Sequence, residues 1–76
     1  MIELYISETC PYCRKVMDFL FDKKTDYAKK DIANSLNLDN LLKIGGKHQV
    51  PFLVDGDVKM YESDDIIKYL REKYVL

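Results

Sequence analysis

The chain has 76 residues, of which 47% are hydrophobic and 33% charged, with 12 Lys and Arg against 13 Asp and Glu. We expect one compact domain over residues 1–76 and no second one. The net charge of −1 supplies no basic face, so no nucleic-acid partner is expected. No apolar run approaches the roughly 20 residues of a spanning helix, and the N-terminus does not resemble a signal peptide, so we expect a cytoplasmic protein without membrane contact.

The first part of the chain predicts a strand followed by a helix. Residues 2–6 alternate apolar and polar side chains and are rich in β-branched and aromatic types, as in a strand. Pro11 is tolerated at the first helical position, so a helix is expected from there to about residue 24. On it, helical spacing gives one apolar face to Cys13, Val16, Met17 and Leu20. Cys13 should therefore face inward, while Cys10 lies at the exposed N-terminal end.

The middle of the chain predicts an edge strand, a helix and a hairpin. Residues 26–32 read as a polar, edge-type strand. Asn34 or Ser35 can cap a second helix that carries Leu38, Leu41 and Leu42 and ends at Gly45-Gly46. Two short apolar runs, residues 50–54 and 57–60, then flank Asp55-Gly56, which is a strong hairpin turn signal.

The C-terminal segment predicts a third helix. Ser63 is a suitable N-cap, and the first turn is acidic through Asp64 and Asp65. An apolar stripe follows at Ile66, Ile67, Leu70 and Tyr74, and the last turn is basic through Arg71 and Lys73. The expected order is β-α-β-α-β-β-α, an α/β fold with a four-stranded mixed sheet and three helices.

The two cysteines, Cys10 and Cys13, are three residues apart. A disulfide between them would close a short loop and add only about 2 kcal/mol of stability. Zinc needs about four ligands and only His48 remains as a soft candidate, so no metal site is expected. At a helix N-terminus, with Arg14 and Lys15 one turn on, Cys10 should instead favour its thiolate form.

The two thiols should therefore differ in role. Cys10 would attack a disulfide, and Cys13, whose burial disfavours the thiolate, would resolve the mixed disulfide. The alternative for Cys13 is that it serves only as a small buried hydrophobe. A C-x-x-C that opens a helix directly after a first strand favours the redox interpretation.

Three motifs resemble the glutaredoxin family over nearly the full length. They are Glu8-Thr9-Cys10-Pro11-Tyr12-Cys13, Gln49-Val50-Pro51 and Asp64-Asp65. The Cys-Pro-Tyr-Cys form is typical of the dithiol members. The resemblance implies a minimal thioredoxin fold and a thiol-disulfide oxidoreductase that reduces protein disulfides and glutathionylated proteins, with glutathione as co-substrate and no tightly bound cofactor.

The resemblance also assigns roles. Cys10 is the nucleophile and Cys13 the resolving thiol, and Tyr12 flanks the glutathione. Val50 pairs its backbone with the cysteinyl unit, and Pro51 is cis. The γ-glutamyl end is held by Ser63 and Asp64, for which helix capping is the alternative interpretation.

The chain departs from the glutaredoxin pattern at two places. Ile6-Ser7 stand where these proteins commonly carry a lysine, which weakens the case for tight glutathione binding. Tyr61-Glu62-Ser63 replace a Gly-Gly pair and resemble the Glu-Ser pair in the N-terminal domain of glutathione transferases, so Glu62 could assist or replace Asp64. Lys43 and Lys47 could meet the glycyl carboxylate or be solvated, and His48 is expected to be a solvated loop residue.

Two other functions stay open at this point. One is a redoxin re-reduced by thioredoxin reductase that donates electrons to a partner such as ribonucleotide reductase. The other is a module that binds glutathione or a partner without redox turnover. A complete glutathione transferase is not expected from 76 residues. A monomer is expected, because no heptad or large apolar surface is evident.

Overall fold

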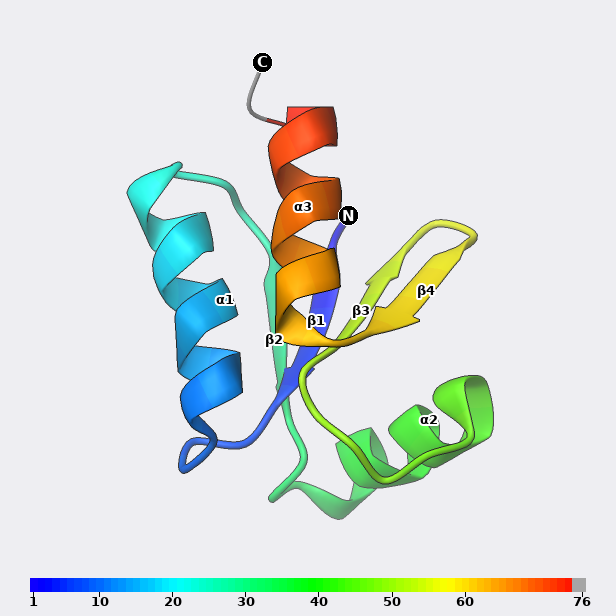
Figure 1. Cartoon of the computed structure of the whole chain (residues 1–76). Helices are drawn as coiled ribbons and strands as arrows, with labels where there is room; N and C mark the ends of the chain where they lie inside the picture. The colour runs from blue at the N-terminus through cyan, green and yellow to red at the C-terminus, as the bar shows by residue number, and fades with distance from the viewer. Residues whose placement is uncertain (75–76) are drawn as a thin grey trace.

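The computed structural model describes residues 1–74, which form three helices and four strands (Figure 1). In chain order these are β1 (Glu3–Ile6), α1 (Pro11–Asp22), β2 (Ala28–Asp31), α2 (Ser35–Gly45), β3 (Phe52–Asp55), β4 (Val58–Tyr61) and α3 (Ser63–Tyr74). The predicted order of elements is confirmed. Strand and helix ends shift by a few residues, where local signals are weakest.

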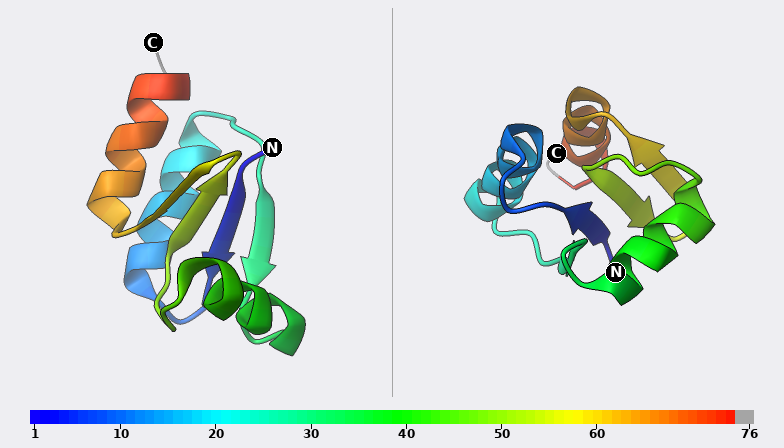
Figure 2. Two further views of the ribbon diagram at one scale, coloured as in Figure 1. Left: turned by 90° about the vertical axis from the view of Figure 1, so that its right-hand side faces the viewer. Right: turned by 90° about the horizontal axis from the view of Figure 1, so that it is seen from below.

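The four strands form one mixed sheet in the order β2-β1-β3-β4. β1 pairs in parallel with β2 and antiparallel with β3, and β3 pairs antiparallel with β4. Helices α1 and α3 cover one face of the sheet and α2 lies on the other (Figure 2). This arrangement confirms the expected thioredoxin-like fold. Within residues 1–74, no helix is both long enough and apolar enough to cross a membrane.

Alternation along β1 divides the core between the two faces of the sheet. Leu4 and Ile6 are fully buried in the cluster under α1 and α3, whereas Tyr5 points to the opposite face and packs with Phe52 and Leu41. Side chains alternate between faces of a strand, so one short strand contributes to both layers. The cluster under α1 and α3 also contains Cys13, with none of its surface exposed. The predicted inward orientation of Cys13 is therefore confirmed.

The ends of α2 follow the predicted capping pattern. Asn34 is the N-cap, and its side chain accepts a hydrogen bond from the N–H of Leu36 at 2.9 Å. Gly46 ends the helix in the left-handed conformation with φ of 84°, which favours glycine. Leu41 is buried, but Leu42 is 41% exposed, so only part of the expected leucine face joins the core.

The hairpin turn lies one residue later than predicted. Asp55 is the last residue of β3, where it pairs with Val58, and the two-residue turn is Gly56-Asp57. Asp55 is only 8% exposed, and its carboxylate accepts hydrogen bonds from the hydroxyls of Tyr69 at 2.7 Å and Tyr74 at 2.6 Å. These long-range bonds hold Asp55 in the strand. They also correct the role of Tyr74, which lies at the surface and not on a purely apolar stripe.

Candidate functional site

Cys10 occupies the N-cap of α1, directly before Pro11. Its Sγ accepts a hydrogen bond from the backbone N–H of Cys13 at 3.3 Å, and its thiol lies 3.9 Å from the carbonyl oxygen of Val50. The residue is half-buried, so it is less open than the sequence suggested. Both cysteines are free thiols. The N-cap position gives Cys10 a backbone donor that can stabilise a developing thiolate.

Cys13 has a very different environment. Burial raises the pKa of its thiol to about 12, and the hydrogen bond with Cys10 adds to the effect. A backbone hydrogen bond at Ser7 acts in the opposite direction. Cys13 is therefore a protonated thiol near neutral pH, as its predicted position on the buried face required.

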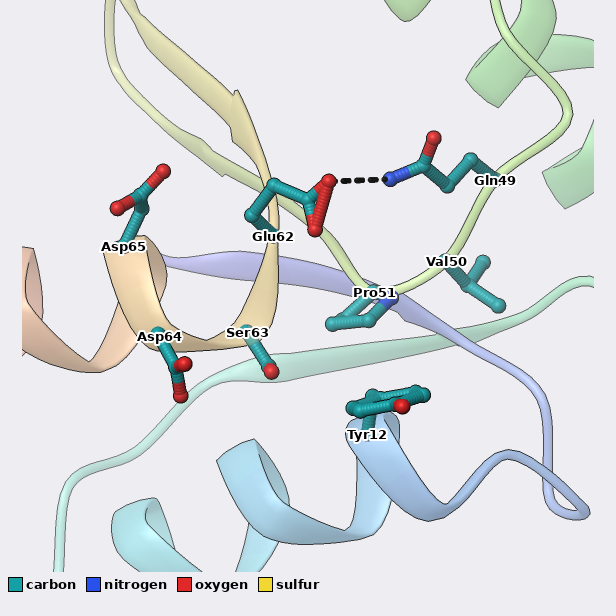
Figure 3. Close-up of a pocket in the computed structure, with 8 residues that line it drawn as sticks. All are labelled: Tyr12, Gln49, Val50, Pro51, Glu62, Ser63, Asp64 and Asp65. Carbon is teal, nitrogen blue, oxygen red and sulfur yellow. Dashed lines mark hydrogen bonds between the residues drawn. The ribbon is translucent and has the colours of Figure 1, made fainter.

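A pocket of about 560 Å³ is lined by residues from three segments of the chain (Figure 3). Its walls come from the first turn of α1, the loop before β3 and the start of α3. They are formed by Tyr12, Gln49, Val50, Pro51, Glu62, Ser63, Asp64 and Asp65. The fold thus brings together all six residues proposed to contact glutathione. Cys10 is not part of the lining, but its thiol faces the Val50 carbonyl at the pocket wall.

Two lining residues, Gln49 and Asp65, were given no binding role from the sequence. The Nε2 of Gln49 donates a hydrogen bond to Glu62 Oε1 at 3.4 Å, as Figure 3 shows. The signal for Gln49 was its place in the Gln49-Val50-Pro51 motif, and for Asp65 its place beside Asp64. The Gln49–Glu62 contact joins the loop before β3 to the start of α3 across the pocket.

The loop before β3 is held from both ends. The Val50-Pro51 peptide bond is cis, as the resemblance implied, and Pro51 is buried. At the other end, the hydroxyl of Tyr61 accepts a hydrogen bond from the N–H of Lys47 at 3.1 Å and donates one to its carbonyl at 3.0 Å. The ammonium of Lys47 also lies over the Tyr61 ring. The Val50 backbone therefore sits on a well-anchored segment.

The start of α3 differs from the sequence prediction. Ser63 is the first helical residue, and Glu62 takes the capping position, because its carbonyl accepts the first helical hydrogen bond from Ile66 at 3.0 Å. Glu62 has φ of 74°, a left-handed conformation that is uncommon outside glycine. The prediction of Ser63 as N-cap is wrong. Ser63 is 7% exposed as a residue, and its side chain points from α3 toward Tyr12 (Figure 3).

Lys15 and Asp64 form an ion pair between α1 and α3, with Nζ and Oδ1 2.6 Å apart. Lys15 was expected to support the Cys10 thiolate, but its ammonium instead lies on the carboxylate at the pocket rim. Both side chains are largely exposed, at 54% and 82%, so the pair contributes little to stability. Its effect on the site is to neutralise one of the carboxylates at the start of α3.

The remaining candidates lie outside the pocket. Lys43, Lys47 and His48 are exposed and do not line it. Over the range 1–74, no group of three or more His, Cys, Asp or Glu side chains is arranged to hold a metal ion.

Comparison with known proteins identifies the family. Residues 4–76 match the model of the glutathione S-transferase N-terminal domain. The chain belongs to this family. The Glu62-Ser63 pair, which resembles the transferase pattern, agrees with this assignment.

The relatives include both long transferases and a short redoxin-like protein. A glutathione S-transferase structure from the Antarctic clam Laternula elliptica shares 38% identity and a TM-score of 0.83, over 96% of this chain and 35% of that one. Dichloromethane dehalogenase of Methylophilus leisingeri is 30% identical over 82% of this chain but only 25% of its own length. An uncharacterized glutaredoxin-like 8.6 kDa protein in the rubredoxin operon of Clostridium pasteurianum is 27% identical over 76% of this chain and 80% of its own. The chain spans about a third or less of the first two relatives.

Proposed function

We propose that this protein is a thiol-disulfide oxidoreductase that acts through Cys10 and Cys13 with glutathione as co-substrate. The observation that carries the proposal is the inequality of the two thiols. Cys10 caps a helix beside an open pocket, while Cys13 is fully buried with its pKa raised to about 12. A half-exposed nucleophile backed by a protonated thiol is the arrangement that disulfide exchange requires.

The reaction follows from these positions. The Cys10 thiolate attacks one sulfur of the substrate disulfide, which breaks and releases one thiolate that takes up a proton. Cys13 then gives up its proton and attacks the Cys10 sulfur, which releases the second thiol and leaves a Cys10–Cys13 disulfide. Two electrons pass to the substrate. Two glutathione molecules return two electrons and become glutathione disulfide.

The pocket supplies groups suited to glutathione. Val50, half-buried in the wall, would pair its backbone with the cysteinyl unit, and Pro51 and Tyr12 would flank the tripeptide. The hydroxyl and N–H of Ser63 suit the γ-glutamyl carboxylate at the start of a helix. Glu62 and Asp64 suit its ammonium. Family membership among glutathione S-transferase N-terminal domains supports this choice of ligand.

The test is a comparison of two reducing systems with one neutral substrate, hydroxyethyl disulfide. Glutathione with glutathione reductase and NADPH should sustain turnover, and thioredoxin reductase with NADPH should not. Turnover only with thioredoxin reductase would overturn the proposal in favour of a thioredoxin-like electron donor. That donor could serve an enzyme such as ribonucleotide reductase.

A second candidate is a module that binds glutathione without redox turnover. The family match favours it, since the model describes a transferase domain and the chain covers only part of the long transferases. The two functions separate in one experiment. A binding module would retain glutathione in equilibrium dialysis but show no disulfide reduction with either reducing system.

A further inference from the structure

The loop that brings Val50 to the pocket has little support from its own backbone. Across the described residues 1–74, no backbone group of residues 47–50 is hydrogen-bonded to another backbone group. Strand pairing begins only at Phe52. A segment without backbone hydrogen bonds opens easily unless side chains supply the missing partners. The position of Val50 therefore depends on side chains that reach the loop from elsewhere.

The end of β4 supplies these partners. The Tyr61 hydroxyl bonds both backbone groups of Lys47, accepting from the N–H at 3.1 Å and donating to the carbonyl at 3.0 Å. The next residue, Glu62, accepts a hydrogen bond from the side chain of Gln49 at 3.4 Å. Tyr61 thus provides the two bonds that a neighbouring strand would otherwise provide, three residues before Val50.

The ring of Tyr61 is itself fixed by packing. Its direct partner across the β3–β4 pair is Phe52, with ring centroids 4.5 Å apart. Phe52 in turn packs on Tyr5 of β1, at 5.8 Å between centroids. Gly45, the last residue of α2, leaves room for the Tyr61 hydroxyl, since a Cβ there would overlap it. Phenylalanine at position 61 would keep the ring contacts and lose only the two bonds to Lys47.

We propose that Tyr61 sets the preference of the site for disulfides that carry a peptide unit next to the reacting sulfur. The inference rests on the proposed redox function, in which the Val50 backbone pairs with the cysteinyl unit. Tyr61 does not line the pocket, so it acts as a positioning residue that holds Val50 in place through Lys47. A disulfide without a peptide unit cannot pair with Val50 and should react independently of Tyr61.

The test compares glutathione disulfide, which has a peptide unit on each sulfur, with hydroxyethyl disulfide, which has none. The common reductant is dithiothreitol, which returns the two electrons and becomes its cyclic disulfide. The bond changes at the two cysteines are those of the proposed reaction. The readout is the ratio of kcat/KM for glutathione disulfide to that for hydroxyethyl disulfide, after subtraction of the uncatalysed rates.

The variant Tyr61→Phe should lower this ratio. We expect a fall of about fivefold or more, because the loop would hold the binding conformation for a smaller fraction of the time. The fall should come from a higher KM for glutathione disulfide, with kcat little changed. The substitution alters no charge, so the different charges of the two substrates do not affect the comparison.

The matched control is Tyr74→Phe. It also removes a tyrosine hydroxyl, one that bonds Asp55 at 2.6 Å and lies outside the pocket lining. This variant loses a comparable bond but should leave the ratio unchanged. An unchanged ratio in Tyr61→Phe would overturn the inference, and so would an equal fall in both variants.

Hydrogen exchange of the unmodified protein tests the loop directly. The amide of Lys47, held by Tyr61, should exchange about tenfold or more slowly than the amides of His48 and Gln49, which donate to no other described residue. Equal exchange rates, after correction for sequence, would overturn the inference even where Tyr61→Phe fails to fold.

The two substrates separate this inference from the proposed function. Reduction of both disulfides by the unmodified protein, with the same ratio in Tyr61→Phe, would leave the redox function in place and refute the role of Tyr61. Absence of reduction of either disulfide by the unmodified protein would refute both.

Discussion

The backbone N–H of Cys13 donates a hydrogen bond to the Sγ of Cys10 at 3.3 Å, across the first turn of α1. This contact places a backbone donor on the Cys10 sulfur, while the Cys13 side chain on the same turn is buried in the core. Two otherwise identical side chains thereby acquire different chemistry from their positions alone. The N-terminus of α1 fixes the positions of both thiols relative to each other.

The two cysteine-to-serine variants should lose different reactions. Cys10→Ser should abolish reduction of both protein disulfides and glutathione mixed disulfides, because no nucleophile remains at the pocket. Cys13→Ser should lose reduction of protein disulfides but keep part of the activity on a glutathionylated peptide, since one thiol suffices for a mixed disulfide. Mass spectrometry of the Cys13→Ser variant should detect glutathione on Cys10. Full activity of the Cys10→Ser variant would refute the assignment.

The raised pKa of Cys13 should be visible in alkaline titration. In a Cys10→Ser background, the ¹³C chemical shift of the Cys13 Cβ should keep its thiol value to about pH 10 in the folded protein, and should titrate near the ordinary pKa of 9.0 in urea. Above pH 9 the unfolded chain loses this proton first, so the free energy of unfolding should fall as pH rises toward 12. Titration of the folded thiol near pH 9 would contradict the buried environment.

Features set by nearby residues were predictable from the sequence. The inward orientation of Cys13 follows from helical periodicity, and the cap of α2 at Asn34 from side-chain hydrogen bonding to the next turn. The places of Val50 and Pro51 in the pocket were instead expected from the resemblance to the glutaredoxin family. Cys13 and Asn34 are the positions where a short stretch of chain determines the geometry.

Features that depend on distant residues were not predictable in the same way. Asp55 was assigned to a turn because Asp-Gly is a strong local signal, but hydroxyl groups from Tyr69 and Tyr74 hold it in β3. The left-handed backbone at Glu62 moved the helix cap away from Ser63, and no local rule places a glutamate there. Local sequence signals fail to predict the structure where a long-range contact outweighs a local preference.

Gly45 should prove sensitive to substitution because of its contact with Tyr61. A Cβ there would overlap the Tyr61 hydroxyl and lie 3.0 Å from the Phe52 ring. Gly45→Ala should lower the free energy of unfolding by about 1–3 kcal/mol and weaken glutathione binding, because Tyr61 anchors the loop at Lys47. Urea unfolding and equilibrium dialysis measure the two effects.

A double-mutant cycle isolates the clash. In a Tyr61→Phe background the overlapping hydroxyl is gone, so the additional cost of Gly45→Ala should shrink. An equal cost in both backgrounds would show that the contact with Tyr61 is not responsible. Gly46→Ala provides a comparison, since its cost comes from φ of 84° and nothing lies within 4 Å of the added carbon.

The hydrogen bonds that Asp55 accepts from Tyr69 and Tyr74 should control the stability of the protein in acid. Hydrogen bonds from Tyr74 and Tyr69 hold the pKa of the Asp55 carboxyl below its ordinary value of 3.8, and the Lys73 ammonium at 3.4 Å acts in the same direction. A carboxyl whose pKa is lower in the folded than in the unfolded state stabilises the protein at pH values above the unfolded pKa. This stabilisation is lost as the pH falls through the folded pKa. The free energy of unfolding should therefore drop below about pH 4, and part of this drop should disappear in Asp55→Asn. Tyr74→Phe should cost about 1 kcal/mol at pH 7 and little at pH 2.

Glu62 should show that function and stability conflict at this position. A residue with a Cβ loses about 1–2 kcal/mol of stability in the left-handed region, which glycine adopts without strain. Glycine in turn makes the unfolded chain more flexible, which lowers the free energy of unfolding by about 0.4–1 kcal/mol. With φ of 74° at this residue, Glu62→Gly should raise the free energy of unfolding by about 0.5–1 kcal/mol. The same change removes the carboxylate that accepts from Gln49, so kcat/KM for a glutathione mixed disulfide should fall. Glu62→Gln keeps the Cβ and should lower kcat/KM without the gain in stability. Loss of stability in Glu62→Gly would mean that the Gln49–Glu62 contact outweighs the backbone strain.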